Sequence, residues 1–163
     1  MKDVVWTFTN KKELGKKEFL SYIEKKIFKT IRKYQMLPRD FIIRLKIKDD
    51  LNTKVLENIL SNKFTVKNSS SPDFSSENLS DIAEEIFNNL TNGIFNGPVP
   101  EDKPHRPLYF VSDKELYLYA KLKSIKGKKK KRDKKIQDLF SKFLDKNPDL
   151  ELNIVKVLSQ IKD

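Results

Sequence analysis

The chain has 163 residues, with 34 Lys and Arg against 23 Asp and Glu, so its formal net charge is +11. It contains no cysteine and one histidine, His105, which excludes disulfides, cysteine-ligated zinc or iron–sulfur sites and thiol catalysis within this chain. The positive charge favours a polyanionic partner, most often nucleic acid, and the alternative is a lysine-rich solvated surface. No apolar run reaches the length of a membrane span, and no secretory segment is recognisable, so we expect a cytoplasmic protein with no membrane partner.

Hydrophobic periodicity predicts alternating strands and helices in the first half of the chain. In the long first helix, Phe19, Ile23 and Ile27 recur at four-residue steps, which indicates one apolar face. The elements predicted here are strands at 3–9, 41–47 and 63–68, and helices within 10–37 and at 51–62. The cations expected on the opposite face of the first helix are Lys25, Lys26, Lys29, Arg32 and Lys33.

The second half predicts mostly helices. Ser112 and Glu115 have the spacing of a capping box, in which each side chain accepts a hydrogen bond from the other residue's amide. The predicted elements are a loop at 68–78, a helix at 79–90, an extended connection at 91–107, a short strand at 108–111, and helices at 113–125, 136–146 and 150–161. The element order predicts an α/β fold with a small, mostly parallel sheet, flanking helices and a helical C-terminal part.

Residues 126–135 contain eight Lys or Arg and one Asp. Because so many like charges repel one another, this run predicts a mobile segment that a nucleic-acid backbone would order. We divide the chain into a domain at 1–125, a basic loop at 126–135 and a C-terminal extension of the same domain at 136–163. The predicted RNA-binding residues are Lys126, Lys128, Lys129, Lys130, Lys131, Arg132, Lys134 and Lys135, together with Lys25, Lys29 and Arg32 on the first helix.

The turn between the strand at 41–47 and the helix at 51–62 reads "KIKDDLNTK" and has no glycine. A phosphate cradle at such a junction needs converging backbone amides, which glycine makes possible. Asp49 and Asp50 would occupy the place of an anion, so the turn predicts an acid-capped helix start.

Three further groups of residues were weighed for chemistry. The carboxylates Asp81, Glu84 and Glu85 could bind magnesium but are typical of a solvated helix face. His105 alone cannot form a catalytic triad, and a surface position is expected for it. The sequence therefore predicts no catalytic, metal or cofactor site. Tyr109, Tyr117 and Tyr119 are expected to be packing residues.

Four stretches together resemble the N-type ATP pyrophosphatases that thiolate tRNA, in that family's order. "ENLSDIAEEIFNNLTNGIF" is similar to the family's "N-L-D-D-x-A-E-T" helix, and "RPLYFVSDKELYLYAKLKSI" to its "R-P-L…V-x-E-K-E-V-x-x-Y-A" segment. "FLSYIEKKIFKTIRKYQML" resembles the helix before the pyrophosphate loop, and "KNPDLELNIVKVL" the C-terminal stretch. They span most of residues 16–158. The resemblance implies a reduced adenine-nucleotide-alpha-hydrolase-like fold and an RNA context.

The departures from the family's pattern concern its chemistry. Lys48, Asp49 and Asp50 stand at the place of the S-G-G-x-D-S pyrophosphate loop, and the paired acids of "D-D-x-A-E" are reduced to Ser80 and Asp81. The family's catalytic and zinc-binding cysteines have no counterpart. The resemblance thus implies a degenerate, non-enzymatic member, similar to the inactive partner subunit of the wobble-uridine thiolation complex. Expected partners are tRNA and an active tRNA thiolase, in a homodimer or heterodimer.

Two alternatives stay open at this point. The first is a stand-alone RNA-binding module that has no enzyme partner. The second is an ATP-using tRNA-modifying enzyme with an unrecognised site.

Overall fold

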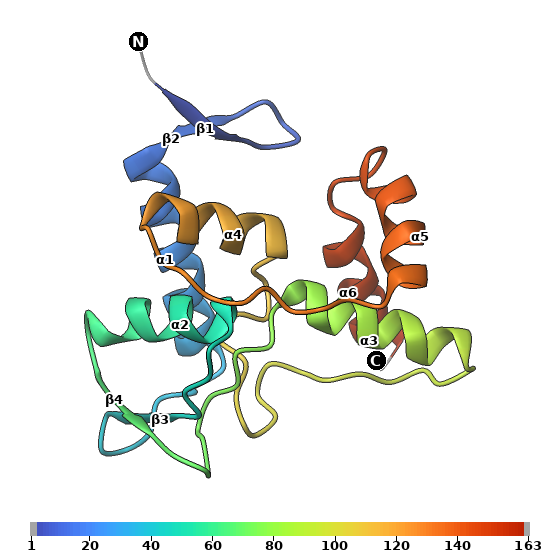
Figure 1. Cartoon of the computed structure of the whole chain (residues 1–163). Helices are drawn as coiled ribbons and strands as arrows, with labels where there is room; N and C mark the ends of the chain where they lie inside the picture. Colours follow the sequence, from blue (N-terminus) through green and yellow to red (C-terminus); the bar gives the residue numbers. More distant parts are fainter. Residues whose placement is uncertain (1–2, 162–163) are drawn as a thin grey trace.

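The computed structural model describes residues 3–161 and is a mixed α/β fold. Within these residues, two short sheets accompany six helices (Figure 1). The strands are β1 (Val4–Thr7), β2 (Glu13–Gly15), β3 (Ile42–Leu45) and β4 (Thr65–Asn68). The helices are α1 (Lys16–Lys33), α2 (Leu51–Ser61), α3 (Leu79–Thr91), α4 (Asp113–Leu122), α5 (Lys134–Leu144) and α6 (Leu150–Ile161).

The strands form two separate pairs, so the predicted mostly parallel sheet is confirmed only in part. β3 and β4 are parallel, with Ile42 opposite Thr65, while β1 and β2 form an antiparallel hairpin. β2 lies where the sequence predicted the start of the first helix. The strand predicted at 108–111 is wrong, because these residues form a turn in which the Val111 amide donates to the Leu108 carbonyl at 2.9 Å.

Each of the predicted helices buries one face, and α2, α3, α4 and α5 also have a side-chain cap at their start. Asp50 Oδ1 accepts from the Thr53 amide at 2.8 Å and caps α2. The predicted capping box of α4 is confirmed: Ser112 Oγ accepts from the Glu115 amide, and Glu115 Oε2 accepts from the Ser112 amide. Asn78 caps α3 and Asp133 caps α5 in the same way, each through a side-chain oxygen.

Two hydrophobic clusters divide the molecule (Figure 1). In the first, α1, α2 and α4 pack together around fully buried side chains such as Phe19 and Tyr119. In the second, α3 packs against α6, and Phe140 of α5 closes the cluster. Residues 123–133 join α4 of the first cluster to α5 of the second, so this connection crosses between them.

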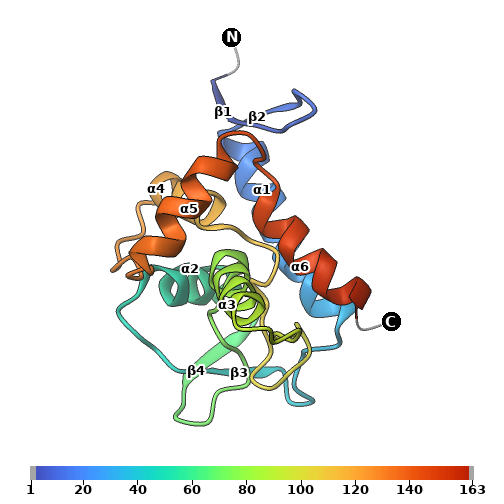
Figure 2. The same cartoon turned by 90° about the vertical axis from the view of Figure 1, so that its right-hand side faces the viewer.

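The two sheets lie at opposite ends of the molecule, as Figures 1 and 2 both show. The β1–β2 hairpin lies beyond the N-terminal end of α1, and the β3–β4 pair lies at the far end. In the described part of the chain, none of the helices combines the length and the apolar character needed to cross a membrane.

Candidate nucleic-acid interface

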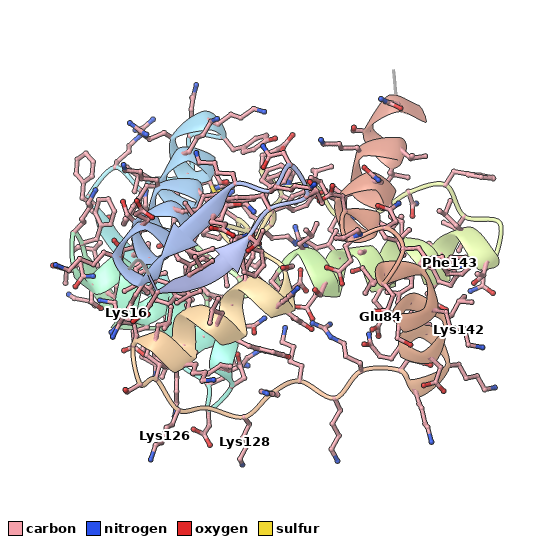
Figure 3. All side chains as sticks on the ribbon, turned by 90° about the horizontal axis from the view of Figure 1, so that it is seen from above. Lys16, Glu84, Lys126, Lys128, Lys142 and Phe143 are labelled. Atoms are coloured by element: carbon pink, nitrogen blue, oxygen red, sulfur yellow. The ribbon has the colours of Figure 1, made fainter. Side chains whose placement is uncertain are left out.

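The basic segment, residues 126–135, has an extended backbone that is hydrogen-bonded to the start of α2. The Leu51 amide donates to the Lys128 carbonyl at 2.9 Å, and the Lys128 amide donates to the Asp49 carbonyl at 2.9 Å. The segment was predicted to be mobile. The structure instead gives it a defined path, because these backbone bonds and the ion pairs described below hold it against the folded chain (Figure 3).

Gly127 makes this close docking possible. A Cβ atom at this position would lie 2.9 Å from both the Cα and the amide nitrogen of Leu51, closer than real Cβ contacts come. Only glycine therefore lets the segment approach the first turn of α2.

Arg132 anchors the other end of the extended stretch. Its side chain is 11% exposed and its guanidinium is shared between two carboxylates. Nη2 lies 2.8 and 2.9 Å from the two carboxylate oxygens of Asp113, Nε lies 3.1 Å from Asp113 Oδ2, and Nη1 bonds to Asp81 Oδ1. Lys130 Nζ also lies 2.7 Å from Asp81 Oδ2. Two of the eight cations of the segment are thus paired with carboxylates of α3 and α4.

The charge of Arg132 is stabilised by this arrangement. Burial by itself would lower the pKa of Arg132, but the hydrogen bonds and charge of Asp113, and the charge of Asp81, raise it further than burial lowers it. The guanidinium therefore stays charged in the folded protein.

The other six cations of the segment are exposed to solvent. They are Lys126, Lys128, Lys129, Lys131, Lys134 and Lys135. The Lys128 side chain is 83% exposed, and its ammonium is 3.7 Å from the exposed carboxylate of Asp49, a weak surface pair. Figure 3 shows Lys126 and Lys128 pointing outward from the segment. Lys134 and Lys135 occupy the first turn of α5, where the helix dipole disfavours positive charge, so helix stability does not explain them.

The cations predicted on α1 form a separate surface. Lys25, Lys29 and Arg32 are exposed, as predicted. Lys26 is not on the solvated face: its ammonium lies 2.9 and 3.1 Å from the two carboxylate oxygens of Glu115. Figure 3 shows α4 between α1 and the basic segment, so the structure does not bring the two sets of cations together.

In the turn at residues 48–50, two of the amides at the start of α2 have hydrogen-bond partners. Asp50 Oδ1 accepts from the Thr53 amide and its Oδ2 accepts from the Thr53 hydroxyl at 3.0 Å. The Leu51 amide is bonded to the basic segment. Asp49 lies 2.6 Å from Lys54, whose hydrogen bond and charge lower the pKa of Asp49, and Lys48 is exposed. The interpretation as an acid-capped turn accounts for each of these contacts.

Of the remaining candidate residues, Asp81, Glu84 and His105 have structural partners. Asp81 is taken by Arg132 and Lys130, and Glu84 accepts from Gln137 Nε2 at 3.3 Å. Residues 3–161 contain no group of three or more His, Cys, Asp or Glu side chains that could hold a metal ion. His105 is half-buried, and its Nδ1 is 2.9 Å from the Glu101 carbonyl oxygen.

Sequence reasoning missed a layer of buried polar side chains beneath the basic segment. Asn78 Nδ2 donates to Asp113 Oδ1 at 2.7 Å, and Ser80 Oγ accepts from the Asp113 amide at 2.9 Å. Ser80 in turn donates to Glu151 Oε2 at 2.8 Å. The sequence signal for this layer was the presence of polar residues at inward positions at the start of α3. The apolar periodicity used to predict the helix does not include them. This layer fixes Asp113, and Asp113 fixes Arg132.

Glu151 gives this layer a measurable pH dependence. Burial raises the pKa of Glu151, and the Ser80 hydrogen bond only partly offsets that effect. The folded state therefore holds this proton more tightly than the unfolded state, so ionisation of Glu151 lowers stability as pH rises above its ordinary value of 4.5. We expect Glu151→Gln to be more stable than wild type at pH 7, with a difference that shrinks as pH falls to 4.5. Urea unfolding of both proteins across this range measures it. A difference independent of pH would contradict the assignment.

Comparison with known proteins gave a structural match alone. No family model matches the chain, and no curated protein sequence matches it. The solved structure of the U34-tRNA thiolase NcsA from Methanococcus maripaludis, determined with its [4Fe-4S] cluster, is similar, with a TM-score of 0.72. The match covers 97% of this chain and 84% of that chain at 12% identity. The predicted thiolase-like fold is thereby confirmed at the level of the fold.

Two consequences follow from this match. The prediction that the chain is not an enzyme is corrected, because the structure whose fold it shares is that of an enzyme. The [4Fe-4S] cluster, in contrast, does not fit this chain: such clusters are held by cysteine thiolates, and the chain has no cysteine. The protein therefore has the fold of a tRNA thiolase without that thiolase's ligands for a cluster.

Proposed function

We propose that this protein binds tRNA in the cytoplasm and assists an active tRNA wobble-uridine thiolase. The observation that carries the proposal is the row of six exposed lysines on the docked basic segment. The likeness of the fold to a U34-tRNA thiolase supports tRNA as the polyanion. The net charge of +11 also attracts a polyanion such as tRNA at longer range.

The docking of the segment makes the lysines a better phosphate-binding surface. Arg132 and the backbone bonds at Lys128 fix the path of the chain before RNA arrives, so less conformational entropy is lost on binding. Lysine presents a point charge without the planar fork that reads a guanine edge. The contacts are therefore expected to be to phosphates, with little dependence on base sequence.

Shape gives this surface its selectivity for tRNA. The cations of α1 and of the basic segment lie on opposite sides of α4 (Figure 3). A folded RNA can present two backbones to these two surfaces, whereas a linear strand meets one at a time. We expect wild-type protein to bind tRNA more tightly than an unstructured RNA of equal length, and Lys25→Ala/Lys29→Ala/Arg32→Ala to lose most of this preference. Fluorescence anisotropy measures both. A preference that the triple variant keeps in full would contradict the role of α1.

The protein partner is expected on α5. The apolar residues Leu116, Tyr119 and Ala120 of α4 are buried within the molecule, so α4 does not offer them to a partner. On α5, in contrast, Leu139 is 38% exposed and Phe143 is 54% exposed. Exposed apolar side chains of this size favour a protein–protein contact.

Light scattering tests the partnership. We expect the protein to form a heterodimer with an active tRNA thiolase, and Phe143→Lys to weaken it. Phe143 is exposed, so this change leaves stability within about 0.5 kcal/mol of wild type. The neighbouring change Lys142→Ala is the control (Figure 3). If the wild-type protein forms no complex with the thiolase, the result would instead favour the interpretation as a stand-alone RNA-binding module.

A further inference from the structure

A cavity of about 650 Å³ lies where the β1–β2 hairpin meets α1, and of its lining residues the proposed function already uses Lys25 alone. This volume is in the range of small-ligand sites. None of the residues that line it belongs to the basic segment. They are Phe8, Asn10, Lys12, Leu14, Lys17, Glu18, Ser21, Tyr22 and Lys25.

Two aromatic rings in the lining are held in place. The centroids of Phe8 and Tyr22 are 5.1 Å apart, with the rings nearly perpendicular at 88°. The Phe8 amide donates to the Lys12 carbonyl at 2.8 Å, which fixes the hairpin at Phe8. The Tyr22 hydroxyl donates to Glu115 Oε1 at 3.1 Å, which fixes the ring from α4. The cavity therefore offers rigid aromatic surface that needs little ordering on binding.

Three exposed lysines surround this aromatic surface: Lys12, Lys17 and Lys25. None of the ion pairs formed within residues 3–161 involves them. The one carboxylate in the lining, Glu18, accepts from the Gly15 amide at 2.9 Å at the start of α1. The rim is thus positively charged, and among the described residues its lysines have no ion-pair partner.

Held aromatic rings bordered by unpaired cations are the two components of single-stranded nucleic-acid sites, where bases stack and phosphates meet the charges. We propose that this cavity binds an unpaired nucleotide of RNA. The base stacks on the Phe8 ring and meets the Tyr22 ring edge to face, and the adjacent phosphates lie beside Lys12, Lys17 and Lys25. The proposal rests on the proposed function in taking RNA as the ligand. An acidic peptide would satisfy the lysines but has no planar group for the aromatic rings.

The test uses a fluorescent six-nucleotide single-stranded RNA that carries one 4-thiouridine. We expect Phe8→Leu, which keeps apolar volume but removes the aromatic plane, to weaken binding about tenfold. Lys12→Ala/Lys17→Ala/Lys25→Ala is expected to flatten the salt slope of log K by about 2. Photocrosslinks from the 4-thiouridine should map to residues 3–12 or 18–25. The matched control is Phe28→Leu, a change at another half-buried aromatic residue that does not line the cavity.

The outcomes separate this site from the proposed function. Unchanged affinity in Phe8→Leu, with crosslinks confined to 126–135, overturns the site and leaves tRNA binding intact. The same conclusion follows if a glutamate hexapeptide displaces the RNA with equal effect on wild type and Phe8→Leu. Binding of the hexanucleotide without binding of tRNA would support the site and contradict the proposed function. If Phe8→Leu does not fold, the lysine variant and the crosslinks on wild type still decide the question.

Discussion

Replacing Arg132 with methionine is expected to lower the free energy of unfolding by about 3 kcal/mol. The change keeps much of the side-chain volume but removes the guanidinium. Among the described residues, no other guanidinium pairs with both Asp81 of α3 and Asp113 of α4. Asp81, 13% exposed, would keep Lys130 as its one cation among the described residues, and Asp113, 22% exposed, would lose its bidentate partner. A loss of this size is a large part of the stability of a small domain.

Urea unfolding of wild type and Arg132→Met measures this effect. The control is the adjacent change Lys131→Met, which removes an exposed charge and should alter stability by less than about 0.5 kcal/mol. A double-mutant cycle with Asp113→Asn isolates the contribution of this pair. The cycle gives a non-zero coupling energy only if the two side chains interact in solution. Equal stability of wild type and Arg132→Met would mean that the segment is not anchored in this way.

The second large effect is expected for RNA affinity. Lys126→Ala/Lys128→Ala/Lys129→Ala/Lys131→Ala removes four exposed charges and leaves the Arg132 anchor in place. Since each phosphate contact releases bound counterions, this variant should bind tRNA roughly 100-fold more weakly in 50 mM salt. The same variant should bind an unstructured RNA more weakly by a similar factor, because lysine contacts to phosphate do not depend on the base sequence.

A variant with the same change in net charge provides the control. Lys67, Lys103, Lys146 and Lys156 are exposed and lie outside the basic segment. Replacing these four with alanine should cost much less affinity, because they contribute only to the long-range field. Equal losses in the two quadruple variants would mean that overall charge, and not the basic segment, attracts the RNA.

Much of the fold followed from local patterns in the sequence. The helices could be predicted because the apolar residues that become buried recur at helical spacing, as do Phe19, Ile23 and Ile27 of α1. The capping box at Ser112 and Glu115 was readable because it is a contact over three residues. The β1–β2 hairpin was missed because residues 10–15 carry no turn signal stronger than the helix pattern that follows. The turn at 108–111 has the composition of a strand but no neighbouring strand to pair with.

The site was harder to predict because its contacts join residues far apart in the chain. Arg132 and Asp81 are separated by 51 positions, so the charge run alone gave no sign that one of its cations is an internal anchor. The sequence therefore predicted a mobile segment, and Asp81 was weighed as a solvated or metal-binding carboxylate. The absence of glycine from the turn at residues 48–50 was visible in the sequence, but the hydrogen bond from the Leu51 amide to the Lys128 carbonyl was not, because it joins two distant segments.

The salt dependence of tRNA binding tests the central claim most directly. Anisotropy titrations of wild type and the Lys126/Lys128/Lys129/Lys131 variant, at a series of salt concentrations, give log K against log salt for each. If the six exposed lysines contact phosphates, they should contribute about −4 to −5 to the wild-type slope, and the variant should lose about 3 of it. A variant that keeps the wild-type slope and affinity would contradict the assignment of the basic segment as the tRNA-binding surface.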